Sequence, residues 1–229
     1  GADLPLVGDA KLVLQQMMEL AKPMKHDEWI AHIKTLGGER KYVEPAKGTV
    51  NPRVFIDRLA KKMPANVTVV ADVGQNQIWT CIEYKFRKEG RLLTSGGMGT
   101  MGYSVPAAIG AKMADDSRAT VAICGDGAFQ MSFMELATAV QFGVDIKVVV
   151  MTNNRLGMVR ELQTNGYHDR QTAVFLDGSP DFIKLAEAYG IPAMRVYDDD
   201  TMEKGIEMLA EHKGICLVEV VVDKDMPTL

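Results

Sequence analysis

The sequence is short of cysteine, and this shortage excludes two classes of protein. Its 229 residues contain only Cys81, Cys124 and Cys216, which lie far apart and show no CxxC spacing. A disulfide framework or a zinc site is therefore not expected, and a reducing cytoplasm fits the composition better. Because Cys124 and Cys216 stand within apolar runs, we expect both to be buried as small hydrophobic side chains.

The sequence also lacks charge clusters and long apolar runs, which argues against two kinds of partner. Its 26 basic and 30 acidic residues are well mixed, with a formal net charge of -4. We therefore expect no nucleic-acid partner. No apolar run approaches the roughly 20 residues of a membrane helix, and no signal peptide is visible. We expect no membrane partner and predict a cytoplasmic protein.

The beginning of the chain differs from the rest. Residues 1–22 are typical of a short strand and an amphipathic helix, which cannot form a domain alone. We interpret them as the remnant of a preceding middle domain. Residues 23–48 contain the Gly37–Gly38 pair, Pro45 and one short surface helix in "HDEWIAHIKTL", and we interpret them as a linker. Residues 49–229 are then the main domain.

From Thr49 onward, continuous apolar strands alternate with helices. The expected strands are 67–73, 91–95, 119–125, 146–152, 192–197 and 215–223. The expected helices are 52–63, 102–114, 131–143, 179–190 with Ser-Pro at its start, and one that opens at Asp200 with Glu203 three residues on. This alternation predicts an α/β fold with a mainly parallel sheet covered by helices on both faces.

Four strand-to-helix loops carry the candidate chemistry. They are rich in Gly, Asn, Gln and Asp, and they are Asp72–Trp79, Ser95–Tyr103, Gly125–Phe129 and Thr152–Met158. In parallel sheets, ligands bind at the carboxyl ends of the strands, where these loops would meet. We therefore expect the binding site to lie among them.

The "GDG" turn at residues 125–127 joins a strand to a helix, although Asp-Gly normally predicts a hairpin. Backbone N–H groups at a helix start bind phosphate well. A carboxylate repels phosphate, so Asp126 suits such a place only with a cation such as Mg²⁺ between them. Asn153 and Asn154, at the end of the next strand, supply amide oxygens. Each pattern alone is typical of a turn, but together they favour a magnesium and phosphate site.

These two motifs carry a family resemblance. "GDG" followed by 25 residues and "NN" resembles the cofactor motif of thiamine diphosphate-dependent enzymes. The stretches "DVGQNQIW", "TSGGMGTMGYSVPAAIGAK", "GDGAFQMSFMELATAV" and "NNRLGMV" are similar, in the same order, to the large catalytic subunit of acetolactate synthase, also called acetohydroxyacid synthase. The resemblance covers most of residues 49–229 and implies the thiamin diphosphate-binding fold, with thiamine diphosphate and Mg²⁺ as cofactors.

The resemblance implies a role for each matching position near the metal and the diphosphate. Asp126 and Asn153 would bind Mg²⁺ through their side chains, and Arg155 through its backbone carbonyl. The residues expected around the diphosphate are Gln75, Asn76, Gly125, Gly127 and Ala128. Asn76 stands where many members have histidine, and it can still donate a hydrogen bond.

Other matching positions would contact the rest of the cofactor. The carbonyl of Gly99 and the N–H of Met101 would bind the aminopyrimidine ring, and the Met101 side chain would hold the cofactor bent. Met158 is expected nearby. The glutamate that activates the cofactor comes from another domain in the family, and Glu135 is not expected to replace it. Leu162 stands where many members have a tryptophan that favours 2-oxobutyrate as second substrate.

The implied reaction joins two 2-keto acids, pyruvate with pyruvate or with 2-oxobutyrate, with loss of CO₂, in branched-chain amino acid biosynthesis. The implied partners are the pyrimidine-binding domain of a neighbouring subunit, in a homodimer or tetramer, and a regulatory small subunit. FAD would be bound in the full-length enzyme but not by this piece, which we expect to be inactive alone. Family members usually continue past "DKDMPTL".

Two alternatives stay open at this point. Glyoxylate carboligase and pyruvate oxidase are related enzymes that share the motifs. The other alternative is a non-catalytic interaction module that kept the fold and lost the chemistry. The intact Asp126 and Asn153 argue against this alternative.

Overall fold

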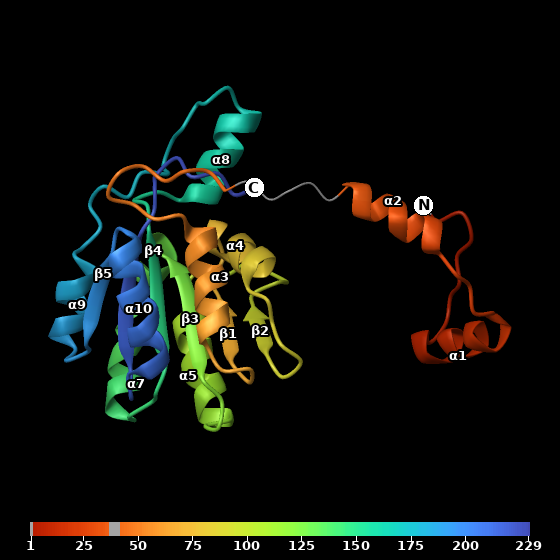
Figure 1. The fold of residues 1–229 in the computed structure, drawn as a ribbon, viewed down its shortest axis with the longest axis horizontal. Helices are drawn as coiled ribbons and strands as arrows, with labels where there is room; N and C mark the ends of the chain where they lie inside the picture. Colours follow the sequence, from red (N-terminus) through yellow and green to blue (C-terminus); the bar gives the residue numbers. More distant parts are fainter. Residues whose placement is uncertain (1, 37–41) are drawn as a thin grey trace. The chain divides into compact units, whose positions relative to one another are not determined.

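The computed structural model describes residues 2–36 and 42–229, and the chain divides into two units, Gly1–Lys41 and Tyr42–Leu229. The first unit holds two helices, α1 (Ala10–Leu20) and α2 (Asp27–Leu36) (Figure 1). The expected helices are confirmed, but the strand expected before the first of them is wrong, because residues 4–7 form no strand.

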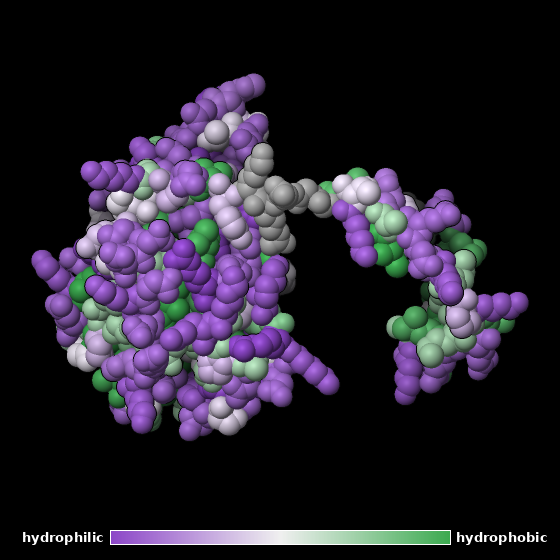
Figure 2. Space-filling model, in the orientation of Figure 1, coloured by the Kyte–Doolittle hydropathy of each residue, from purple (hydrophilic) through white to green (hydrophobic). Residues whose placement is uncertain are grey.

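The helices of the first unit keep their apolar side chains on the surface. None of their residues is buried. Leu12, Met18, Trp29 and Ile33 are all exposed, and Figure 2 shows hydrophobic side chains on these helices. An amphipathic helix normally buries its apolar face against a partner. That residues 1–22 belong to a preceding domain stays a prediction.

The second unit is built on a six-stranded sheet with the strand order β2-β1-β3-β4-β6-β5. Every neighbouring pair of these strands is parallel. The strands are β1 (Thr68–Ala71), β2 (Arg91–Thr94), β3 (Thr120–Gly125), β4 (Lys147–Thr152), β5 (Ala193–Val196) and β6 (Cys216–Val221). The predicted α/β fold class and all six expected strands are confirmed.

Helices connect the strands of this unit. They are α3 (Pro52–Lys62), α4 (Gln75–Glu83), α5 (Ser104–Ala114), α6 (Asp126–Gln130), α7 (Leu136–Gln141), α8 (Gly157–Gly166), α9 (Phe182–Ala188) and α10 (Asp199–Glu211), with a 3₁₀ turn at Phe133–Glu135. In the described part of the chain, no helix has both the length and the apolar character needed to cross a bilayer.

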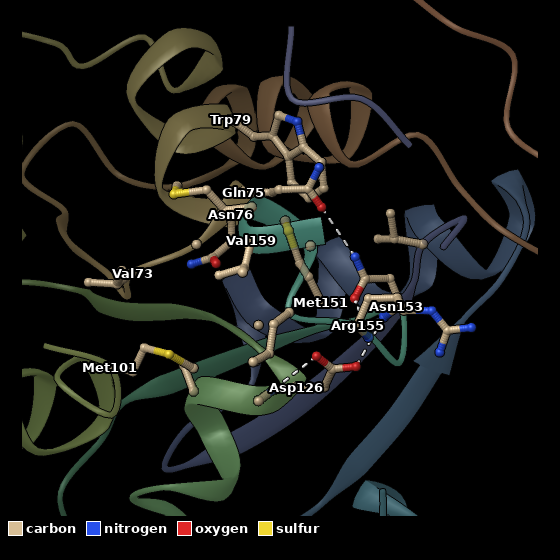
Figure 3. Close-up of a pocket in the computed structure, with 18 residues that line it drawn as sticks. Val73, Gln75, Asn76, Trp79, Met101, Asp126, Met151, Asn153, Arg155 and Val159 are labelled. Atoms are coloured by element: carbon tan, nitrogen blue, oxygen red, sulfur yellow. Dashed lines mark hydrogen bonds between the residues drawn. The ribbon is translucent and has the colours of Figure 1, made fainter. Parts of the chain in front are cut away.

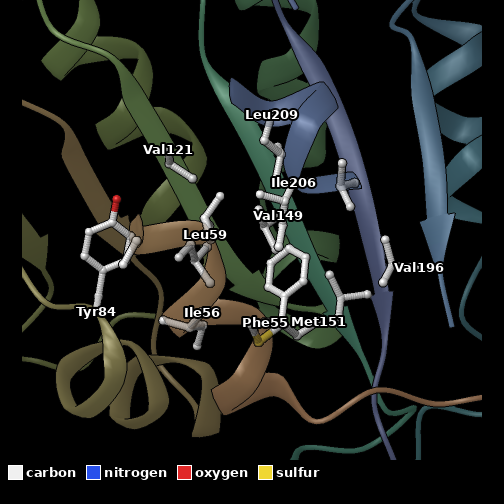
Figure 4. Packing of buried hydrophobic residues seen from close by; sticks show 14 of the residues in the cluster. Phe55, Ile56, Leu59, Tyr84, Val121, Val149, Met151, Val196, Ile206 and Leu209 are labelled. Carbon is white, nitrogen blue, oxygen red and sulfur yellow. The ribbon is translucent and has the colours of Figure 1, made fainter. Parts of the chain in front are cut away.

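The helices cover both faces of the sheet (Figure 1). One apolar core lies between the sheet and α3, α4 and α10, and the other lies under α5, α6, α7 and α9. Figure 4 shows the first core, which joins Phe55 and Leu59 of α3 to Val121 and Val149 of the sheet. Strands buried on both faces have no polar side to expose, which explains their continuous apolar runs. Cys124 and Cys216 are buried as expected.

The expected single helix at residues 131–143 is wrong. The helix that follows β3 begins at Asp126, and the helical conformation is interrupted at Ser132, whose φ of -144° is not helical. A second helix follows from Leu136. Phe129 and Leu136, on either side of the break, are both fully buried, while Met131 between them is 59% exposed. Positions seven apart also share one face of a continuous helix, so the apolar pattern alone does not reveal the break.

Two expected helix starts were also wrong, each by two residues. The helix α9 is capped by Asp181, whose side chain accepts from the N–H groups of Ile183 and Lys184, and not by Ser179. The helix α10 is capped by Asp198 in a capping box with Thr201. Each aspartate reaches the first-turn N–H groups from an extended backbone, and the local sequence offered several equivalent caps.

Candidate functional site

The sheet reverses its winding between β1 and β3. The connection from β1 runs through α4 to β2 at one edge, while the connection from β3 runs through α6 and α7 to β4 on the other side. Ligands of open α/β sheets bind in the crevice that such a reversal leaves at the carboxyl ends of the strands. The loops after β1, β3 and β4 meet here around a cavity of about 90 Å³ (Figure 3).

The cavity brings together ten of the predicted site residues. They are Gln75, Asn76, Met101, Gly125, Asp126, Gly127, Ala128, Asn153, Arg155 and Met158. Complete ligand pockets usually enclose roughly 300–1,000 Å³. The enclosed space suits a metal and a phosphate group, so most of a larger ligand would lie outside it.

Asp126 is the first residue of α6 and is 1% exposed. Its Oδ1 accepts from its neighbour, the N–H of Gly127, at 2.8 Å. Its Oδ2 accepts from the N–H groups of Asn153, at 3.2 Å, and Asn154, at 2.6 Å. The carboxylate therefore ties the end of β3 to the loop after β4 and fixes the spacing of the two motifs.

Among residues 2–36 and 42–229, the Asp126 carboxylate forms no ion pair with a lysine, arginine or histidine. Burial raises the pKa of the Asp126 carboxyl to about 6, and the N–H groups of Asn154, Gly127 and Asn153 oppose this shift only in part. A buried carboxylate without a counter-ion is costly, and a bound cation would offset that cost.

The two asparagines after β4 play different parts. The Oδ1 of Asn153 accepts from the N–H of Arg155 at 3.0 Å, which is an Asx turn. Asn154 has a positive φ of 54°, a conformation that asparagine tolerates better than most residues. Asn153 lines the cavity and Asn154 does not. This placement favours Asn153 over Asn154 as a metal ligand, and the family resemblance implies the same residue.

Gln75 and Asn76 begin α4, and both are almost completely buried. The Asn76 amide donates to the carbonyls of Asp72, at 2.8 Å, and Ile123, at 3.1 Å, and so joins the ends of β1 and β3. The Gln75 amide nitrogen is bonded near the C-terminus, 2.9 Å from the carbonyl of Met226. Both side-chain amide nitrogens are therefore hydrogen-bonded within the chain, and the expected contacts of Gln75 and Asn76 with a diphosphate stay a prediction.

Two glycines lie close to the ends of neighbouring side chains. A Cβ on Gly127 would lie 2.8 Å from Leu156 and 3.1 Å from Leu176. A Cβ on Gly157 would lie 1.9 Å from the Oε1 of Gln75. A side chain at either position would therefore force these neighbouring side-chain ends to shift. The N–H of Gly127, expected at the diphosphate, instead donates to Asp126.

Two predicted residues lie outside the cavity lining. Gly99 has a φ of +63° in an exposed loop, with open space where a Cβ would stand. Leu162 is 63% exposed on α8. Met101, two residues after Gly99, does line the cavity and comes within 3.6 Å of the position of a Cβ on Gly127.

Sequence reasoning missed Asp72. This buried carboxylate follows β1 and accepts from the N–H groups of Gly102, at 3.1 Å, and Ser104, at 2.7 Å. It thereby fixes the loop that carries Met101 and the start of α5. An acidic residue at the end of an apolar strand was the available signal. The C-terminal residues that contact Gln75 were missed as well, because no local pattern marks them.

The residues present fit a divalent cation held against a phosphate. A carboxylate and an amide oxygen, with backbone carbonyls, are the oxygen donors that Mg²⁺ prefers beside substrate phosphates. Within the described ranges, no group of three or more His, Cys, Asp or Glu side chains could hold a metal by itself. The donor set of Asp126 and Asn153 is thus incomplete without ligand oxygens, as expected where a metal bridges protein and phosphate.

Comparison with known proteins agrees with this site. Residues 72–220 match the family model described as thiamine pyrophosphate enzyme, C-terminal TPP binding domain. The matched range includes the loops after β1, β3 and β4 that form the cavity.

Several curated proteins are similar to nearly the whole chain. The acetolactate synthase large subunit of Lactococcus lactis is 35% identical over 224 residues, which are 97% of this chain and 39% of that protein. Isozyme 3 of Escherichia coli is 35% identical, with 97% and 41% covered. The mitochondrial catalytic subunit of Saccharomyces cerevisiae is 37% identical, with 97% and 33% covered. The chain therefore spans about two fifths or less of these relatives.

Proposed function

The chain belongs to the thiamine pyrophosphate enzymes, as their C-terminal TPP binding domain, and we propose that it is the diphosphate-binding part of an acetolactate synthase large subunit. The longer protein would join pyruvate to pyruvate or to 2-oxobutyrate, with loss of CO₂. The similarity of 97% of the chain to three such subunits supports the choice of enzyme. Branched-chain amino acid biosynthesis is the corresponding role.

The buried Asp126 carboxyl is the observation that carries this proposal. It lies at the point where the sheet reverses its winding, and no basic side chain pairs with it in the described part of the chain. A Mg²⁺ ion between this carboxyl and a diphosphate would offset the cost of burying the charge.

Each residue has a defined part in the proposed complex. Asp126 and Asn153 would hold Mg²⁺ through side-chain oxygens, and Arg155 through its carbonyl. The Arg155 guanidinium donates to the carbonyl of Asn154 and to Asp177, each at 2.7 Å, and not to the Arg155 carbonyl. Met101 would support the bent cofactor. When bound, thiamine diphosphate supplies an electron sink for decarboxylation of a 2-keto acid.

The proposal extends to partners outside this chain. The activating glutamate would come from the pyrimidine-binding domain of a neighbouring subunit, in a homodimer or tetramer, with FAD bound elsewhere in the full-length protein and a regulatory small subunit attached. The exposed loop around Gly99 and the exposed Leu162 are suited to face such a partner and the second substrate. The three free cysteines fit a cytoplasmic location.

Binding without catalysis is the test of this proposal. We expect calorimetric titration of the chain with thiamine diphosphate to give a saturable signal with Mg²⁺ and none with EDTA. Thiamine monophosphate should bind much more weakly, because it lacks the second phosphate. The same sample should form no acetolactate from pyruvate, since the activating glutamate is supplied by another domain.

Two results would count directly against the proposal. Equal binding with EDTA would remove the role of the metal, and acetolactate formation at a normal rate would contradict the need for a second domain. The alternatives make different predictions for the longer protein. Peroxide release would favour a pyruvate oxidase, and consumption of glyoxylate would favour a glyoxylate carboligase. Equal heats for the parent and Asp126→Ala would favour a non-catalytic module.

The raised pKa of Asp126 predicts how pH affects the metal-free protein. A carboxyl whose folded pKa of about 6 exceeds its unfolded value of about 3.9 stabilises the fold most below pH 4. That contribution is lost as pH rises through 6, by at most about 1.4 kcal/mol per pH unit. Urea unfolding in EDTA should therefore show the parent losing stability relative to Asp126→Asn between pH 4.5 and 6.5. A pH-independent difference between the two would contradict the raised pKa.

A further inference from the structure

The loop after β4 is held by a later segment of the chain, Val174–Asp177. Arg155 in the loop and Phe175 in the segment form an isolated antiparallel bridge. Two backbone hydrogen bonds flank this bridge, at 2.9 Å from the N–H of Leu156 to the carbonyl of Val174 and at 3.0 Å from the N–H of Leu176 to the carbonyl of Asn154. The backbone of Arg155, whose carbonyl would bind the cation, is therefore fixed by this segment.

The same segment also holds the Arg155 side chain. The guanidinium lies over the ring of Phe175, with its Cζ 4.7 Å from the ring centroid. It also donates to the carboxylate of Asp177 and to the carbonyl of Asn154, each at 2.7 Å. With these partners, the charged side chain of Arg155 is only 14% exposed. Figure 3 shows it extending away from the Asp126 carboxylate.

Arg155 and Asp126 are nevertheless neighbours in the site. Among the described residues that line the cavity, Arg155 is the only basic one and Asp126 the only acidic one. A guanidinium that reached a buried carboxylate would form a strong, often bidentate pair with it. Such a pair would occupy the oxygens that a cation needs, and the guanidinium would repel the cation. The ion pair of Arg155 with Asp177 prevents this competition.

We propose that Phe175 and Asp177 keep the Arg155 guanidinium away from the Asp126 carboxylate and so leave this carboxylate to the cation. Neither Phe175 nor Asp177 lines the cavity, so both are positioning residues. Arg155 then gives its carbonyl to the site while its charge is directed elsewhere. The inference rests on the proposed function, because the cation is the one that would link Asp126 to thiamine diphosphate.

Variants of the 229-residue chain test this proposal. Asp177→Asn removes the charge that pairs with the guanidinium, and Phe175→Leu removes the ring beneath it. At saturating thiamine diphosphate and low ionic strength, we expect Asp177→Asn to weaken Mg²⁺ binding by about threefold, and the two substitutions together by about tenfold. Glu207→Gln removes the same charge at an exposed position of α10 and should bind Mg²⁺ like the parent. Unfolding midpoints measured without cofactor show whether the fold is retained.

Removal of the guanidinium separates the proposal from a purely structural role of the segment. In an Arg155→Gln background, Asp177→Asn should cause no further loss of Mg²⁺ affinity, because no guanidinium is left to reach Asp126. An equal loss in both backgrounds would overturn the proposal. Parent-like affinity in the variant that combines Asp177→Asn with Phe175→Leu would overturn it as well.

A second measurement needs no cofactor. The Nε–H signal of Arg155 in ¹H–¹⁵N spectra should shift in Asp177→Asn, because the released guanidinium leaves the ring of Phe175, and it should not shift in Glu207→Gln. If the parent itself binds no Mg²⁺ with thiamine diphosphate, the proposed function fails. The holding of Arg155 by Asp177 is then decided by this signal: a shift supports it, and an unchanged signal overturns it.

Discussion

Asp126→Ala should abolish the Mg²⁺-dependent binding of thiamine diphosphate, with a loss of affinity of at least about 100-fold, or about 2.7 kcal/mol. The variant removes the buried carboxylate that would neutralise the cation, and Asn153 and the Arg155 carbonyl are left as neutral ligands. Diphosphate and protein would then lack the charge that links them. Calorimetric titration at fixed Mg²⁺ measures the effect directly.

Loss of the fold must be separated from loss of the metal ligand in this variant. The alanine leaves the N–H groups of Gly127, Asn153 and Asn154 without their acceptor. Asp126→Asn keeps one acceptor oxygen and should fold, yet it should also fail to bind the metal. Asp200→Ala, at an exposed aspartate on α10, is the matched control and should bind like the parent. Parent-like affinity in Asp126→Asn would contradict the metal site.

Gly157→Ala should weaken the binding of thiamine diphosphate and Mg²⁺ by about tenfold or more, although the added methyl group carries no charge. A Cβ at this position would lie 1.9 Å from the oxygen of Gln75 and 2.9 Å from the amide nitrogen of Asn153. One of these side chains, or α8 itself, must move, and the hydrogen bond between them is lost. Overpacking of this kind also costs about 1–3 kcal/mol of stability.

The same helix offers the control. Gly166 lies at the other end of α8, and no atom lies within 4 Å of the position that its Cβ would take. Gly166→Ala should leave both cofactor affinity and unfolding free energy within about 0.5 kcal/mol of the parent. If the two alanine variants bind the cofactor equally well, the close contact between Gly157 and the Gln75–Asn153 pair has no role in the site.

Local patterns predicted the sheet well and the helix boundaries less well. Strands buried on both faces must be apolar along their whole length, so the six strands were visible in the sequence. The break at Ser132 was not visible, because Phe129 and Leu136, seven positions apart, would also lie on one face of a continuous helix. The helices α4 and α8, which begin at Gln75 and Gly157, were not predicted, since the glycine and polar residues at their starts are equally typical of loops.

The candidate site was predictable where it depends on residues near a strand end. Asp126 and Asn153 follow adjacent strands, so the alternation of strands and helices alone placed them together. The donor roles expected of Asn76 and Gly127 could not be checked from sequence. In the structure, the Asn76 amide donates to the carbonyls of Asp72 and Ile123, and the N–H of Gly127 donates to the Asp126 carboxylate.

The parallel sheet, the loops that meet at its carboxyl edge and the pairing of a carboxylate with an amide there were all predictable from local patterns. These features depend on periodicity and on residues a few positions apart. The absence of a basic partner for Asp126 among the described residues became known from the fold, and so did the contact between Gln75 and the carbonyl of Met226, 151 positions away. The sequence could not predict that contact, because the direction of the Gln75 amide depends on partners that folding brings together.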